Sequence, residues 1–187
     1  MRSYLRGEEG VTLVEFALSI PILTLAMVGI MEVSMVLFVS SMMEGGVREA
    51  ARFGITGGAP DGQTREERII EIVSDRTLGL LKLSEEDISM LIYPSFDSVG
   101  KPEPFTDNSP ENDVYDEGED FLDVNGNGVW DADMGAAGLG GPGDIVLYRI
   151  DAQWELMTGL LNSMLGEDGK VSLTASIVVR NEPFGEP

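Results

Sequence analysis

A single acidic residue lies near the start of the longest apolar run in the chain. Glu15 follows Gly10 and Val11, and no charged residue occurs between Phe16 and Met31. An ionised carboxylate in hydrocarbon costs at least a few kcal/mol, so such acids are rare and usually functional. The position of Glu15 therefore indicates ion pairing with a partner. The alternative is that its side chain only reaches back to the membrane interface.

The second segment with the residue types for chemistry is 100–143, which is rich in Asp, Glu, Asn and Gly. It contains a degenerate repeat, because residues 105–116 are echoed by residues 121–131, one residue shorter. In the second copy, oxygen-bearing side chains alternate before a glycine, as in the first half of an EF-hand calcium loop. The candidate ligands of this copy are Asp123, Asn125, Asn127, the carbonyl of Val129, and Asp131. Hard oxygen ligands of this kind suit Ca²⁺.

Both copies depart from the EF-hand pattern. Met134 stands where the second copy needs its closing Glu, which leaves Asp133 as an imperfect substitute. In the first copy Asp107 opens the loop and Glu119 is placed to close it once the extra residue is allowed for. The residues that stand where Asp or Asn is usual are Ser109 and Glu111. We therefore expect a weak calcium site, the alternative being a solvated acidic loop whose Asn-Gly pairs make turns.

The apolar run itself predicts a transmembrane helix over residues 11–40. About 20 predominantly apolar residues span roughly 30 Å of hydrocarbon, and Glu32 would then lie at the far interface. Pro21 predicts a mild kink. The positive charges of Arg2 and Arg6 favour a cytoplasmic N-terminus. A removable secretory signal peptide is the alternative, although its apolar core is usually shorter than this run.

Beyond the span, the pattern predicts that the same helix continues over 44–53 and ends in the Gly- and Pro-rich segment 56–62. Thr64 and Glu67 fit a capping box at the start of an amphipathic helix over 65–82. Alternating apolar residues predict the strands, and a helical segment is expected between the last two. These strands cover 88–93, 145–155 and 171–180, and the helical segment covers 157–165.

Together these elements predict an α+β fold with one extracytoplasmic domain at 41–187. A long N-terminal helix precedes an antiparallel sheet of about three strands, with helices on one face and the acidic loop at 100–143 as an insertion. Tyr115, Trp130 and the Phe residues of the loop are candidates for anchoring it to the domain.

Composition restricts the possible functions. The 187 residues include no Cys and no His, which removes thiol nucleophiles and the usual general base near neutral pH. Only an enzyme that uses carboxylates alone would remain, and no pair of acids stands out for that role, so we expect no catalytic site. The net charge of -21 argues against nucleic acid as a partner, because binding it requires neutralising phosphates.

Three segments together resemble a known family. They are GVTLVEFALSIPIL from residue 10, VREAARFG from residue 47 and VVRNEPF from residue 178. A glycine before an apolar run with Glu as its fifth residue is the arrangement of type IV prepilins. The three segments together resemble TadE-like pseudopilins of the Tad (Flp) pilus system. The segment GLGGPGDIVLY is also similar to that family.

The resemblance implies a role for each matching residue. Residues 1–10 would be a leader that a prepilin peptidase removes by cutting between Gly10 and Val11, and Glu15 would meet the new N-terminal amine of a neighbouring subunit. The implied partners are other pilin subunits, the inner-membrane assembly machinery and the lipid bilayer. The implied location is the bacterial inner membrane, with the domain in the periplasm or on the pilus. A membrane-anchored, calcium-stabilised binding or adhesion domain outside any filament is the alternative.

Overall fold

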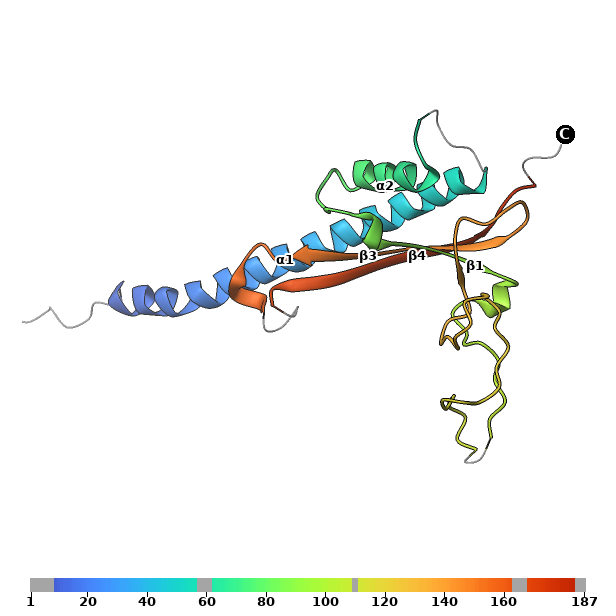
Figure 1. Cartoon of the computed structure of the whole chain (residues 1–187). Helices are drawn as coiled ribbons and strands as arrows, with labels where there is room; N and C mark the ends of the chain where they lie inside the picture. The colour runs from blue at the N-terminus through green and yellow to red at the C-terminus, as the bar shows by residue number, and fades with distance from the viewer. Residues whose placement is uncertain (1–8, 57–61, 109–110, 163–167, 184–187) are drawn as a thin grey trace, which may run out of the picture. The chain divides into compact units, whose positions relative to one another are not determined.

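The computed structural model describes residues 9–56, 62–108, 111–162 and 168–183. It contains a long N-terminal helix, a second, shorter helix and a four-stranded antiparallel sheet (Figure 1), which confirms the predicted α+β class. The chain divides into two compact units. One unit comprises residues 1–40 and 153–173, and the other comprises residues 41–152 and 174–187.

The N-terminal helix, α1, runs without interruption over Glu9–Ile55. Its continuation beyond residue 40 is therefore confirmed, and the helix passes through Pro21 even though proline has no N–H to donate. The kink at Pro21 stays a prediction. Two serine hydroxyls donate to main-chain carbonyls one turn earlier, Ser19 to Glu15 and Ser34 to Ile30. These bonds satisfy the two hydroxyl groups on an otherwise apolar surface.

The second helix, α2, spans Arg65–Arg76 and begins with the predicted capping box. The Thr64 hydroxyl accepts the N–H of Glu67 at 3.1 Å, and the Glu67 carboxylate accepts the N–H of Thr64 at 2.9 Å. These two bonds satisfy main-chain donors that have no partner inside the helix.

The predicted end of α2 at residue 82 is wrong. After Arg76 the chain turns into the left-handed region, with φ of 54° at Leu78 and 66° at Gly79. The N–H of Gly79 bonds back to the carbonyl of Ser74 at 3.0 Å, a pattern that closes helix C-termini. Because apolar residues continue past this point at Leu78, Leu80 and Leu81, the sequence pattern did not indicate the end of the helix.

The sheet has the strand order β2-β1-β3-β4. The strands β1 (Ile88–Tyr93) and β3 (Ile145–Glu155) have the predicted bounds, and β4 (Lys170–Arg180) begins one residue earlier than expected. They are joined by a fourth strand, β2 (Ala136–Ala137), which is too short to show any alternation in the sequence. β1 and β3 pair antiparallel with Leu91 opposite Leu147.

In the second unit the helices pack on one face of the sheet, as predicted. Val146, Tyr148 and Ile150 of β3 are buried on this face. A Cβ added to Gly54 of α1 would lie 2.1 Å from the Tyr148 hydroxyl oxygen, so only glycine permits this approach. Close packing between α1 and α2 at Gly46 likewise leaves no room for a larger residue without a shift.

Three predictions fall partly outside the described residues. Of the predicted helix over 157–165, the structure describes a 3₁₀ turn, η3, at Gly159–Leu161, and residues 163–167 lie outside. Residues 1–8 of the predicted leader at 1–10 and Phe184 of the terminal motif also lie outside.

Candidate functional site

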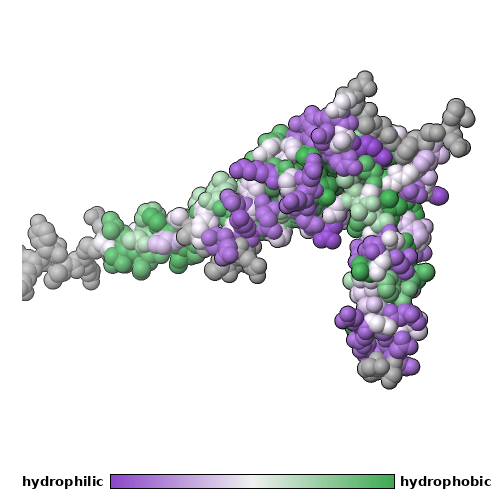
Figure 2. All heavy atoms as spheres, viewed as in Figure 1, coloured by the Kyte–Doolittle hydropathy of each residue, from purple (hydrophilic) through white to green (hydrophobic). Residues whose placement is uncertain are grey.

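The N-terminal part of α1 carries a continuous set of exposed apolar side chains (Figure 2). They include Val11, Leu13, Val14, Phe16, Leu18, Ile22, Leu23, Met27 and Ile30. Within the described residues, Gly10–Ile55 form a helix that is long and apolar enough to cross a membrane, and 11% of its most apolar window is buried inside the protein. Its side chains are thus available to lipid or to other proteins, and this helix suggests membrane anchoring.

Glu15 lies on this apolar surface with its side chain exposed. Within the described part of the chain its carboxylate makes no hydrogen bond or ion pair. Gly10 and Val11 are exposed in the first turns of the same helix, and a Cβ at Gly10 would meet nothing within 4 Å. The residues predicted to be cut and to pair are therefore all accessible.

Glu32 is a site residue that the sequence interpretation missed, because it was expected at the membrane interface. Its side chain is 0% exposed, and its carboxylate accepts the main-chain N–H groups of Met157 (3.1 Å) and Thr158. Leu161 of the same segment lies 3.7 Å from the Cβ position of Gly29. The buried charge is thus satisfied by main-chain donors within its own unit.

The second copy of the acidic repeat folds around Asp123. This carboxylate accepts three N–H bonds from residues 126–128, at 2.6 to 3.1 Å. The amide nitrogens of Asn125 and Asn127 both donate to one oxygen of Asp131, at 2.7 and 2.6 Å. Four of the predicted ligands therefore belong to one hydrogen-bonded loop.

The loop of the second copy is closed by Glu103, which lies two residues before the start of the first copy. Glu103 is 0% exposed, and its carboxylate accepts the N–H groups of Val124, Asn125 and Asp131 at 2.7 to 3.2 Å. The sequence analysis considered Met134 and Asp133 at the end of this loop and did not single out Glu103.

The first copy repeats this arrangement with Glu119, whose predicted role as a calcium ligand stays a prediction. Its carboxylate accepts the N–H of Asn108 at 2.7 Å and that of Asp116 at 3.0 Å. Asp107 accepts the N–H of Asn112, and the amide of Asn112 donates to Asp116 at 3.1 Å. Asn112 therefore matches Asn127 of the second copy. The sequence interpretation had aligned Ser109 and Glu111 with the ligand positions, and Ser109 lies outside the described residues.

The two copies exchange their closing acids. Glu103 and Glu119 each stand two residues before a phenylalanine, Phe105 and Phe121, which form an antiparallel bridge. Glu103 precedes the first copy and closes the loop of the second. Glu119 precedes the second copy and closes the loop of the first, so each copy depends on the acid that precedes the other. The repeated Glu-x-Phe pattern was the sequence signal that could have identified Glu103.

The aromatic residues hold the copies together rather than anchoring them to the sheet, which corrects the earlier expectation. Tyr115 stacks on Trp130 with ring centroids 4.6 Å apart, and Phe105 packs edge-on against both at 5.8 and 6.0 Å. The Trp130 N–H also donates to the carbonyl of Glu103 at 2.9 Å.

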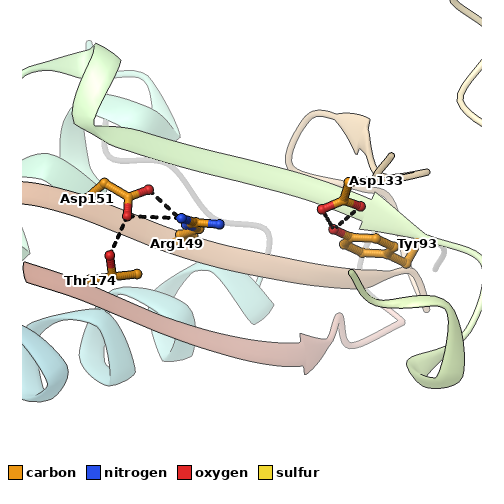
Figure 3. A network of polar contacts seen from close by, with 5 residues as sticks. All are labelled: Tyr93, Asp133, Arg149, Asp151 and Thr174. Carbon is orange, nitrogen blue, oxygen red and sulfur yellow. Dashed lines mark hydrogen bonds and ion pairs between the residues drawn. The ribbon is translucent and has the colours of Figure 1, made fainter. Parts of the chain in front are cut away.

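Contact with the sheet comes from a different set of residues. A cluster around Tyr93 and Leu147 buries Met134 of the loop, with Val124 packed against it. The Tyr93 hydroxyl donates to Asp133 at 2.7 Å (Figure 3). Burial, and next the bond to Asp133, raise the pKa of Tyr93 to about 12.

A second group of bonded polar side chains lies on the sheet beside the pair of Tyr93 and Asp133 (Figure 3). Asp151 accepts bonds from Arg149 at 2.8 Å and from the Thr174 hydroxyl at 2.6 Å. Burial alone would raise the pKa of Asp151, but the bonds from Thr174 and Arg149 outweigh it and hold the pKa below its usual range.

The loop has the donor types for Ca²⁺ but not yet their orientation. A hollow of about 440 Å³ is lined by Asn125, Asn127, Asp131 and Asp133. Among the described residues no group of three carboxylates is placed to hold a metal ion. The two Asn side chains turn nitrogen toward Asp131 and would have to rotate to offer oxygen. Calcium binding stays a prediction.

Comparison with known proteins bears on the helix. Residues 10–52 match the family model described as TadE-like protein. Over this helix the chain is similar to TadE-like proteins. The match covers the first of the three segments and the second as far as Arg52, and it supports a role connected with the Tad pilus in general. No curated protein and no solved structure matches the chain.

Proposed function

We propose that this TadE-like chain is a pseudopilin or minor pilin that acts as a structural or priming subunit in Tad pilus assembly. The observation that supports this most directly is Glu15, an acid without a partner among the described residues, on an exposed apolar helix whose first turn contains Gly10 and Val11. A prepilin peptidase would cut after Gly10, and the helix would then pack among other pilin helices.

Glu15 would pair with the N-terminal amine that this cut creates on a neighbouring subunit. Two opposite charges in lipid relieve each other's desolvation, so the pair favours docking before a subunit leaves the membrane. The domain from residue 41 onward would lie in the periplasm and contact further subunits.

Determination of the mature N-terminus tests the proposal. Protein purified from cells that express the pilus system should begin at Val11, as read by N-terminal sequencing. A Gly10→Phe variant should keep its first ten residues, and a Gly7→Phe variant should be cut normally. Wild-type protein that still begins at Met1 would overturn the proposal.

We also retain calcium as a proposed ligand of the acidic loop, because Asp123, Asn125, Asn127 and Asp131 already lie in one loop. Calorimetry of the full chain should detect Ca²⁺ at millimolar concentration, in the range of weak extracellular sites. Asp131→Asn should abolish the heat and Glu117→Gln, an exposed acid outside the bonded set, should retain it. No heat with the wild type would end this proposal and leave the assembly role untouched.

A further inference from the structure

A hollow of about 350 Å³ lies between α2, the 3₁₀ turn η1 (Glu85–Asp87) and β1, entirely within the second unit. It is lined by Thr64, Glu66, Ile70, Glu85, Ile88 and Met90. We call it the α2–β1 hollow. None of these residues takes part in the cleavage, pairing or calcium chemistry discussed above.

The floor of the α2–β1 hollow is apolar and partly exposed. Ile70 comes from α2, and Ile88 and Met90 come from β1, all of them half-buried. Next to this floor, β2 pairs with β1 only at Leu91 and Ile92, and the N–H of Gly138 bonds to the carbonyl of Met90 at 2.9 Å. The first half of β1 therefore has a strand neighbour on one side only within the described residues.

The rim of the hollow carries two carboxylates, from Glu66 and Glu85. Neither side chain makes a hydrogen bond or ion pair in the described part of the chain. Glu66 lies in the first turn of α2, where an acid is electrostatically favourable, and Glu85 lies in the short turn η1. On the rim, these two negative charges without an ion-pair partner flank the apolar floor of the hollow, which makes the hollow complementary to a cation with an apolar stem.

We propose that the α2–β1 hollow binds a Lys or Arg side chain, flanked by an apolar residue, from a partner protein. The aliphatic stem would lie on Ile70, Ile88 and Met90, while the cation would lie between Glu66 and Glu85. A second copy of this chain is a poor occupant, since two copies with a net charge of -21 repel each other. The inference goes beyond the assembly role and does not depend on it.

Fluorescence anisotropy of the full chain in detergent tests this inference. The probe is a dye-labelled acetyl-Ala-Leu-Lys-Ile-Arg-Leu-Ala-amide, compared with the same peptide carrying Gln in place of Lys and Arg. The basic peptide should bind saturably and the Gln peptide should not. Glu66→Gln combined with Glu85→Gln should weaken binding by about fivefold or more, as expected for two exposed ion pairs.

A matched double variant, Glu86→Gln with Glu117→Gln, removes the same charge from exposed positions outside the hollow. It should bind the basic peptide as the wild type does. Met90→Gln tests the floor independently and should weaken binding while circular dichroism shows an unchanged fold. Equal losses in both double variants, or binding of the Gln peptide, would overturn the inference, as would absence of saturable binding.

Discussion

Two acids on the same helix have opposite surroundings. Glu15 is exposed among exposed apolar side chains, whereas Glu32 is 0% exposed and accepts two main-chain N–H bonds. A buried carboxylate that receives hydrogen bonds keeps its charge at an acceptable cost. Within the described residues the fold therefore supplies partners to Glu32 and none to the carboxylate of Glu15.

This contrast predicts two different effects of substitution. Replacing an acid that has an internal partner should lower the stability of its own unit, whereas replacing an acid without one should weaken only the complex that supplies the partner. The predictions that follow test this division, beginning with the variant from which we expect the largest effect.

Glu15→Ala should leave cleavage after Gly10 intact but reduce incorporation into the pilus by about 100-fold. The reason is that an unpaired terminal amine in lipid costs a few kcal/mol that pairing would otherwise recover. Immunoblots of sheared pili against membrane fractions measure the ratio.

Ser19→Ala is the matched control, because Ser19 is exposed one turn later and bonds only to the carbonyl of Glu15. It should assemble as the wild type does. Normal piliation by Glu15→Ala would show that this acid has no pairing role.

Glu32→Ala should act on the fold instead. Loss of the carboxylate leaves the N–H groups of Met157 and Thr158 without their acceptor, at about 3 kcal/mol for two bonds to a charged group. Hydrogen exchange at these two amides should accelerate by about 100-fold. Exchange unchanged from the wild type would mean that Glu32 does not hold this segment, and Glu44→Ala, an exposed acid of α1, serves as the control.

The two acids also show what the sequence could and could not reveal. Glu15 was identified because its surroundings are local, a run of apolar neighbours in the chain. The partners of Glu32 lie 125 and 126 residues away, and they are main-chain groups that carry no residue-type signal. The same limit applies to Glu103, whose partners follow 21 to 28 residues later.

The elements of the fold divide in the same way. The bounds of β1 and β3 follow from alternation over 6 and 11 residues, which is a local pattern. The two-residue strand β2 exists only because β1 lies beside it. The end of α2 depends on the left-handed turn at Leu78, a residue type that gives no warning of it.

Glu103→Gln should have a smaller effect than Glu32→Ala, because the amide keeps one oxygen as an acceptor. We expect exchange at Val124, Asn125 and Asp131 to accelerate by about tenfold. The effect should stay within the second copy of the repeat. Glu119→Gln should instead affect Asn108 and Asp116 of the first copy, so identical exchange patterns in the two variants would refute the exchange of closing acids.

The smallest effect concerns Tyr93, a neutral donor to an internally paired acid. Burial and its bond to Asp133 raise the pKa of its hydroxyl to about 12, above the ordinary value near 10. The folded state thus holds this proton more tightly than the unfolded state. The resulting stability is present in full below about pH 10 and is lost as the pH rises toward 12.

Tyr93→Phe should therefore lower the free energy of unfolding at neutral pH by about 1 kcal/mol, the net value of one hydrogen bond. Ultraviolet titration should lose a tyrosine that ionises near pH 12 in the wild type. Tyr115→Phe removes a tyrosine whose ring stacks on Trp130 and is the matched control. Loss of the late phase in Tyr115→Phe, with its retention in Tyr93→Phe, would show that Asp133 has a different partner and that the loop meets the sheet by another contact.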